Sequence, residues 1–164
     1  MIIISVNFSR KTLLEENLLE TINAIQEKYG IPRQYIEIEI TESLGEVDRD
    51  SMIHMGKKIS KEGYLLTLDD FGSKYSNISI LSAVTFNVLK IDKSLVKDVF
   101  SNPRSKVIVR NFIDSCRSLG INTVAEGVET MEQYEVLKEM GCDCIQGYFI
   151  NKPLSVVDFE KKYI

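Results

Sequence analysis

The sequence contains no long apolar run. Its apolar start, Met1 to Ile4, is far shorter than the roughly 20 consecutive apolar residues that cross a bilayer. The same stretch does not have the layout of a signal peptide. We therefore expect that this segment does not insert into a membrane.

The chain also lacks an excess of positive charge. Its 20 Lys and Arg residues are outnumbered by 24 Asp and Glu residues, which gives a formal net charge of -4. This balance argues against the broad basic surface that binds a nucleic-acid polymer. It does not argue against a small phosphorylated ligand, because bound metal ions can supply positive charge locally.

Cysteine is scarce as well. Cys116, Cys142 and Cys144 do not make a disulfide framework, and no second group of His or Cys completes a zinc site. Free thiols in a reducing cytoplasm are the better interpretation. No low-complexity linker divides the 164 residues, so the sequence predicts a single domain over 1–164.

The same sequence pattern recurs along the chain. Helix-like segments end at Gly30, Gly63, Gly120 and Gly141, and each glycine is followed by an apolar run. A glycine at this place is typical of the left-handed residue that ends a helix. The apolar runs predict strands in "YIEIEIT", "YLLTLDD", "INTVAE" and "CIQGYFI", and two more strands are predicted in "IIISVNF" and "FNVLKID".

Amphipathic helices are predicted between these strands. Apolar residues recur at helical spacing over Leu13–Tyr29 and over Val107–Leu119. Asn102 followed by Pro103 predicts a helix start. A capping box of Thr130 and Gln133 predicts another start, for a helix over Met131–Met140.

Strands that alternate with helices predict parallel strands joined by crossovers, in either a doubly wound open sheet or a (β/α) barrel. The first strand is not followed by a glycine-rich phosphate turn, which weighs against a nucleotide-binding open sheet. We therefore expect an α/β protein of the (β/α)8 TIM-like barrel family. About six strands are present, so the barrel is expected to be incomplete.

Polar residues at the strand ends favour the barrel further. In a barrel the carboxyl ends of the strands meet at one mouth, where active sites are built. Taken singly, each polar residue can be a turn former, a helix cap or a surface charge, but that does not explain why nearly every strand ends in this way. In "YIEIEIT", alternation places Glu39 on the face opposite Ile38 and Ile40, inside the mouth. The residues at or near strand ends are Asn7, Glu39, Asp69, Lys90, Asp92, Glu126 and Gln146.

Two adjacent carboxylates, Asp69 and Asp70, end the strand "LLTLDD". Buried negative charges are costly unless a cation balances them. Carboxylate and amide oxygens are ligands that suit Mg²⁺ or Mn²⁺ better than zinc. A pair of such ions can clamp the attacking and leaving oxygens of a phosphodiester. The pattern therefore predicts a metal site at the mouth.

Six segments at the strand ends resemble, in order, the motifs of the EAL-domain family. They are "SVNFS", "EIEITES", "TLDDFGSKYSN", "LKIDKSLV", "TVAEGVET" and "QGYFINKPL". The resemblance covers nearly the whole chain. It implies a barrel that hydrolyses the bacterial second messenger cyclic di-GMP to linear pGpG with Mg²⁺ or Mn²⁺, with two ions in the complete domain.

The resemblance also implies roles for individual residues. Metal ligands would be Asn7, Glu39, Asp69 and Asp70. Lys90 would lie beside the attacking water and the phosphate, and Glu126 would act as base or bind the second metal through water. Outside the metal's own ligands, Gln146 and Glu129 would support the site, and Glu42 would anchor the loop that couples the site to a dimer interface.

The sequence departs from the family pattern in two places. Lys74 replaces a glycine of the loop after Asp70, which can impair activity if that position needs a positive φ. The Glu-Ala-Leu motif is absent, and a full barrel typically needs about 250 residues. We therefore expect the C-terminal two-thirds of an EAL-type domain, weakly active or inactive alone and prone to self-association, from a parent that can carry membrane or sensory domains upstream.

Two other functions remain open at this point. The first is a catalytically inactive module that binds cyclic di-GMP or a protein partner. The absent glutamate and Lys74 favour it, whereas the retained carboxylates and Lys90 favour the enzyme. The second is an unrelated metal-dependent barrel enzyme, which six ordered motifs make the weakest alternative.

Overall fold

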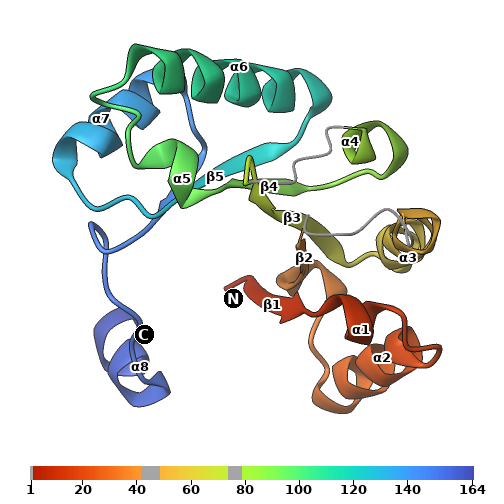
Figure 1. Ribbon diagram of the computed structural model, residues 1–164. Helices are drawn as coiled ribbons and strands as arrows, with labels where there is room; N and C mark the ends of the chain where they lie inside the picture. Colours follow the sequence, from red (N-terminus) through yellow and green to blue (C-terminus); the bar gives the residue numbers. More distant parts are fainter. Residues whose placement is uncertain (1, 42–48, 74–78) are drawn as a thin grey trace.

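In the computed structural model of the chain, residues 2–41, 49–73 and 79–164 are described, and six parallel strands form one curled sheet (Figure 1). Their order in the sheet is their order in the chain, so every connection moves one position in the same direction. The sheet therefore curls into a half-barrel. The strands are β1 (Ile4–Phe8), β2 (Ile36–Thr41), β3 (Leu65–Phe71), β4 (Val88–Ile91), β5 (Asn122–Glu126) and β6 (Cys144–Gln146).

The helices between the strands lie on the outer side of the sheet, and one more helix, α8 (Val156–Tyr163), follows the last strand (Figure 1). Those before β4 are α1 (Arg10–Leu13), α2 (Leu18–Tyr29), the 3-10 turn Arg33–Tyr35, α3 (Arg49–Glu62) and α4 (Ile80–Ala83). Those after β4 are α5 (Lys93–Val96), α6 (Pro103–Leu119), α7 (Met131–Met140) and α8 (Val156–Tyr163). None of the helices in these described ranges has the length and apolar content to span a membrane.

The core lies between the sheet and the outer helices. Alternate residues of the central strands point outward into it, and these side chains are fully buried: Ile38, Ile40, Leu66, Leu68, Leu89 and Ile91. Because side chains on a strand alternate between its faces, the residues between them point into the half-barrel. The predicted face of Glu39, opposite Ile38 and Ile40, follows from this arrangement.

The predicted helix ends are confirmed. Asn102 accepts a hydrogen bond from the backbone N–H of Arg104 at 2.9 Å, with Pro103 in the first turn of α6. Thr130 and Gln133 form the complete capping box of α7. The glycines that end α2, α6 and α7 have φ values of 62°, 70° and 75°, in the left-handed region where a side chain would be strained.

The single helix predicted over Leu13–Tyr29 is wrong: α1 ends at Leu13 and α2 begins at Leu18. The backbone N–H of Leu18 bonds to the carbonyl of Glu15, which closes a turn between the two helices. Leu18 is buried, whereas Leu14 is exposed. The apolar spacing was continuous, but the polar residues between these leucines form the turn.

The strand predicted in "CIQGYFI" is too long, because β6 ends at Gln146. Gly147 lies directly against the backbone of Val128. The backbone N–H of Val128 bonds to Gln146, and that of Phe149 bonds back to Val128. These bonds turn the chain away from the sheet at Gly147.

Replacing Gly147 with Ala is expected to lower the free energy of unfolding by about 2–3 kcal/mol, because the added Cβ would collide with rigid backbone at Val128. Gly30→Ala is the matched control. No atom lies within 4 Å of a Cβ built there, so only its positive φ is penalised, by roughly 1 kcal/mol. Urea unfolding of both variants measures the difference, and equal losses would contradict the close packing at Val128.

The three cysteines are free thiols in three different environments. Cys116 is buried, Cys142 is half-buried and Cys144 is exposed. Burial raises the pKa of the Cys116 thiol to about 11. Cys116 is therefore a small core residue that stays protonated at neutral pH.

The segment from Gly147 to Ser155 leads from β6 to α8, which lies apart from the other helices (Figure 1). None of its residues is buried, although Val156, Val157 and Tyr163 are apolar or aromatic. The first strand also exposes apolar residues, among them Ile4 and Val6. Both ends of the half-barrel therefore carry uncovered apolar surface.

Candidate metal centre

A bulge in β3 brings the two adjacent aspartates to the same side of the sheet. Leu68 pairs with Leu89 and Phe71 pairs with Ile91, so β3 has one residue more than β4 over this interval. Such an extra residue bends a strand and redirects a side chain. Asp70 accordingly has a φ of 58°, the only positive φ among the non-glycine residues that the structure describes.

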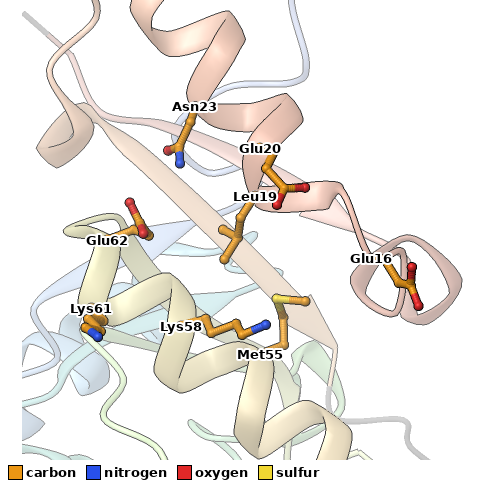
Figure 2. A pocket seen from close by; sticks show the side chains of 8 residues that line it. All are labelled: Glu16, Leu19, Glu20, Asn23, Met55, Lys58, Lys61 and Glu62. Atoms are coloured by element: carbon orange, nitrogen blue, oxygen red, sulfur yellow. The ribbon is translucent and has the colours of Figure 1, made fainter.

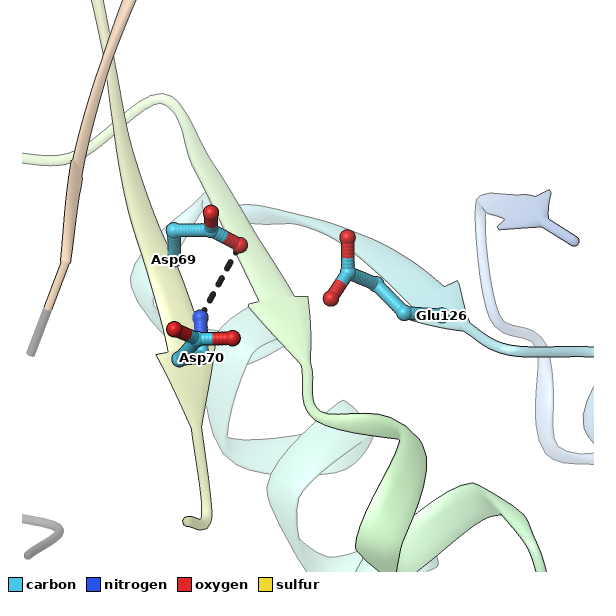
Figure 3. A group of neighbouring side chains, drawn as sticks. All are labelled: Asp69, Asp70 and Glu126. Atoms are coloured by element: carbon cyan, nitrogen blue, oxygen red, sulfur yellow. Dashed lines mark hydrogen bonds between the residues drawn. The ribbon is translucent and has the colours of Figure 1, made fainter. Parts of the chain in front are cut away.

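The bulge answers why two carboxylates can stand side by side in the sequence. On a regular strand Asp69 and Asp70 would point to opposite faces. Here their carboxylate oxygens, together with one of Glu126 from β5, lie within 4.8 Å of one another (Figure 3). The backbone N–H of Asp70 also donates to Oδ1 of Asp69 at 2.9 Å, which fixes the first carboxylate.

Lys90 lies at the centre of the mouth. Its side chain, 7% exposed, extends from β4 between β3 and β5. The Nζ atom is 2.8 Å from Glu126 Oε1, 3.2 Å from Asp69 Oδ1 and 3.2 Å from Glu39 Oε2. Three strands therefore contribute one carboxylate each to a single ammonium group.

The electrostatics of this cluster show a shortage of positive charge. Burial lowers the pKa of Lys90, but the hydrogen bond and charge of Glu126, followed by the charges of Asp69 and Glu39, raise it above its ordinary value. Burial raises the pKa of Glu126 despite Lys90, and the charges of Asp69 and Asp70 add to this effect. One ammonium does not balance four carboxylates, so a further cation would stabilise the site.

The backbone of Asp70 gives a prediction for the metal-free protein. Asp70→Ala should be less stable to urea than Asp70→Gly by about 1 kcal/mol, because only glycine adopts a positive φ without strain. Asn tolerates this conformation better than Ala, so Asp70→Asn tests the charge instead. Equal stabilities of the Ala and Gly variants would contradict the bulge geometry.

The charge of Asp70 has a defined pH dependence in the same experiment. Burial first, and then the charges of Asp69 and Asp92, raise the pKa of Asp70 above 3.8. A raised pKa in the folded state means that protonated Asp70 stabilises the folded protein. This stabilisation is present below pH 3.8 and is lost as the pH rises through the folded-state pKa. In EDTA, Asp70→Asn should therefore gain stability relative to the unsubstituted chain over that range, and no gain should appear below it.

Strand register places two more predicted site residues at the mouth. Asn7 pairs with Glu39, and Gln146 pairs with Glu126. Partners in a parallel ladder share a face, so both residues lie on the inner face of the half-barrel. Among the described residues, neither side chain makes a hydrogen bond or an ion pair. Their expected roles therefore rest on register alone.

Four further positions named from the sequence have different outcomes. Glu129 is exposed in the loop before α7, where its backbone N–H donates to Gln133 at 2.8 Å. Asp92 caps α5 by accepting from the backbone N–H of Ser94 at 2.9 Å, which is the ordinary structural role of a strand-end aspartate. Glu42 and Lys74 lie outside the described residues.

Sequence reasoning missed the polar layer beneath the mouth. The hydroxyl of Ser5 donates to the buried carboxylate of Glu37. Ser5 and Glu37 are paired across β1 and β2, two residues before the pair of Asn7 and Glu39. Thr67 is fully buried, and within the described part of the chain its hydroxyl has no hydrogen-bond partner. The alternation that places Glu39 inward also places Glu37 inward, so the signal was present in "YIEIEIT".

A separate pocket opens on the outer side of the sheet, between α2 and α3 (Figure 2). Its rim carries glutamates from the α2 side and lysines from α3, for example Glu20 and Lys58. One of its polar groups, Asn23, is already bonded to the hydroxyl of Tyr64 at 2.6 Å. The pocket holds charges of both signs and lies away from the carboxylate cluster, so it does not belong to the mouth.

The cluster at the mouth fits a divalent cation that binds oxygen. Ligand oxygens about 2.1 Å from one Mg²⁺ lie at most roughly 4.2 Å apart, so the oxygens within 4.8 Å need only a small adjustment. All the donors are carboxylates, and neither His nor Cys is among them. This donor set suits Mg²⁺ or Mn²⁺.

Comparison with known proteins decides the family. The family model described as EAL domain matches residues 1–153. The chain belongs to the EAL-domain family. The resemblance inferred from six strand-end motifs is thereby confirmed, as is the TIM-like barrel class.

The chain resembles curated proteins in sequence and solved structures in fold. It is 34% identical over 160 residues to cyclic di-GMP phosphodiesterase PdeB of Shewanella oneidensis, covering 98% of the chain. The crystal structure of the EAL domain of Mycobacterium smegmatis DcpA superposes with a TM-score of 0.91 at 32% identity and covers 98% of the chain. The Klebsiella pneumoniae BlrP1 manganese/cy-diGMP complex superposes with a TM-score of 0.84 at 28% identity over 90%.

The EAL match spans only part of these proteins. The chain corresponds to 19% of PdeB, to 72% of the DcpA chain and to 38% of the BlrP1 chain. It also corresponds to 20% of the signaling protein YkoW of Bacillus subtilis. The activities of whole relatives therefore bear on this chain only as proposals.

Proposed function

We propose that this EAL domain takes part in the metal-dependent hydrolysis of cyclic di-GMP to linear pGpG. The observation that carries the proposal is the set of carboxylates from β2, β3 and β5 around Lys90 at the mouth of an EAL half-barrel. The name of PdeB as a cyclic di-GMP phosphodiesterase and the BlrP1 complex with manganese and cyclic di-GMP support the choice of substrate and cofactor.

The residues divide into ligands and reacting groups. Asn7, Glu39, Asp69 and Asp70 would hold Mg²⁺ or Mn²⁺, which when bound polarises a phosphate oxygen and lowers the pKa of a water molecule. The bulge presents Asp69 and Asp70 together, so both can serve one centre. Gln146 and Glu129 would support these ligands from outside, and Glu42 would anchor the loop after Asp70.

Lys90 and Glu126 would act on the phosphodiester itself. The ammonium of Lys90 would lie where negative charge develops on the phosphoryl oxygens, in a site shielded from water. Glu126, whose pKa is raised by burial, would accept the proton of the attacking water. The two groups are 2.8 Å apart, so each orients the other.

Asp69→Asn tests the proposal most directly. It should lower cyclic di-GMP hydrolysis by on the order of 10²–10³-fold, in any preparation of the protein that is active, and should weaken Mn²⁺ binding measured by calorimetry. Asp98→Asn removes the same charge from an exposed position and should change neither.

Two results would contradict the proposal. Full hydrolysis by Asp69→Asn would show that the cluster is not the reaction centre. Saturable binding of cyclic di-GMP by the unsubstituted chain with Mn²⁺ present, and no pGpG formed by any form of the protein, would assign the inactive binding module instead.

We also propose that the chain self-associates through the ends of its sheet. Within the described residues β1 pairs only with β2, and β6 only with β5, so each leaves one edge unpaired. Exposed apolar side chains lie along β1 and on α8. Unpaired edges with apolar neighbours favour pairing with another chain.

A further inference from the structure

Lys90 contacts the same carboxylates that a metal ion would use. Its Nζ atom is 3.2 Å from Asp69 and 2.8 Å from Glu126, and these two residues form the candidate cation cluster with Asp70. The ammonium therefore already stands beside the ligand oxygens of that cluster. The third contact, with Glu39 at 3.2 Å, adds a carboxylate from β2.

The arrangement is a buried one. The side chains of Lys90, Glu39 and Asp69 are 7%, 5% and 11% exposed. Buried carboxylates at this spacing repel one another unless a cation lies between them. In the described part of the chain, Lys90 is the cation that contacts Glu39, Asp69 and Glu126. Lys90 therefore joins carboxylates of β2, β3 and β5.

We propose that Lys90 is a built-in counter-ion, a positioning residue that preassembles the ligand carboxylates and keeps the divalent metal weakly and reversibly bound. The inference rests on the proposed metal centre. It adds that the lysine opposes metal binding. A dication and the ammonium would both contact Asp69 and Glu126, and these two positive charges would repel each other at close range. Removing the ammonium removes this repulsion and leaves the carboxylates to the metal.

The chain offers a matched set of variants. Lys90→Met removes the charge and keeps an unbranched apolar side chain, and Lys90→Gln removes the charge but keeps a hydrogen-bond donor. Lys90→Arg keeps the charge. Lys97→Met changes the net charge equally at an exposed position on the C-terminal side of α5.

Titration with Mn²⁺ alone, followed by calorimetry and by thermal unfolding, tests the proposal. Lys90→Met and Lys90→Gln should bind Mn²⁺ at least about tenfold more tightly than the unsubstituted chain. When all the proteins are in EDTA, these two variants should unfold at a lower temperature than the unsubstituted chain. Lys90→Arg and Lys97→Met should stay within about twofold of the unsubstituted affinity.

The outcomes separate this inference from the proposed function. Mn²⁺ affinity that is unchanged or weaker in both neutral Lys90 variants, with clear binding by the unsubstituted chain, would overturn the inference alone. Tighter binding by Lys97→Met as well would assign the effect to net charge and would also overturn it. No Mn²⁺ binding by any of the proteins would overturn the metal centre itself.

Discussion

Lys90→Ala is expected to reduce kcat for cyclic di-GMP hydrolysis by about 100-fold or more, while KM changes by less than roughly threefold. The ammonium contacts three carboxylates in a buried mouth, so its charge is available without reorganisation when the phosphoryl group gains negative charge. An interaction that strengthens in the transition state raises kcat, whereas one of equal strength in both states changes KM.

The measurement must keep the metal centre saturated, because we also expect Lys90 to oppose metal binding. Steady-state kinetics at several Mn²⁺ concentrations, extrapolated to saturation, meets this need. Lys97→Ala, at an exposed position, is the control and should leave both constants unchanged. A raised KM with kcat unchanged would show that Lys90 is a uniform binding contact.

The second large effect concerns association. Ile4→Lys should convert a self-associating chain into a monomer, because Ile4 is 65% exposed on the strand that ends the sheet. A charged residue on an edge strand disfavours pairing with another edge. Sedimentation velocity over a range of protein concentrations measures the change.

Ile25→Lys is the matched control for this effect. Ile25 is 53% exposed on α2, away from any strand edge. The substitution is identical and the exposure similar, so general solubility effects are shared. A monomer produced by Ile25→Lys as well, or an Ile4→Lys protein that associates as before, would contradict association through the β1 edge.

The parts of the fold that local sequence determines could be predicted. A helix cap depends on a few adjacent residues, and Asn102 with Pro103 and Thr130 with Gln133 were found for that reason. The alternation in "YIEIEIT" likewise identified the inward face of Glu39. The polar residues at strand ends supplied most other candidates for the site, and the family resemblance supplied their roles together with Glu42 and Glu129.

The features that depend on other strands could not be predicted. The bulge at Asp69 and Asp70 exists only as a mismatch between β3 and β4, so neither strand shows it alone. The contacts of Lys90 depend on how β2, β3 and β5 are arranged around it. The sequence identified these carboxylates as candidates. It did not show that they contact Lys90 instead of forming turns or capping helices.

The strand order also bears on how the domain forms. Each strand pairs with the strand next to it in the chain, so the sheet can grow by adding one strand and helix at a time. Each new pairing therefore closes a loop of one strand and helix unit rather than of the whole chain, and a shorter loop costs less entropy to close. The mouth does not share this advantage, since Glu39 and Glu126 meet at Lys90 only after β5 has docked. A nascent chain therefore has most of its secondary structure before it has the means to carry out any chemistry.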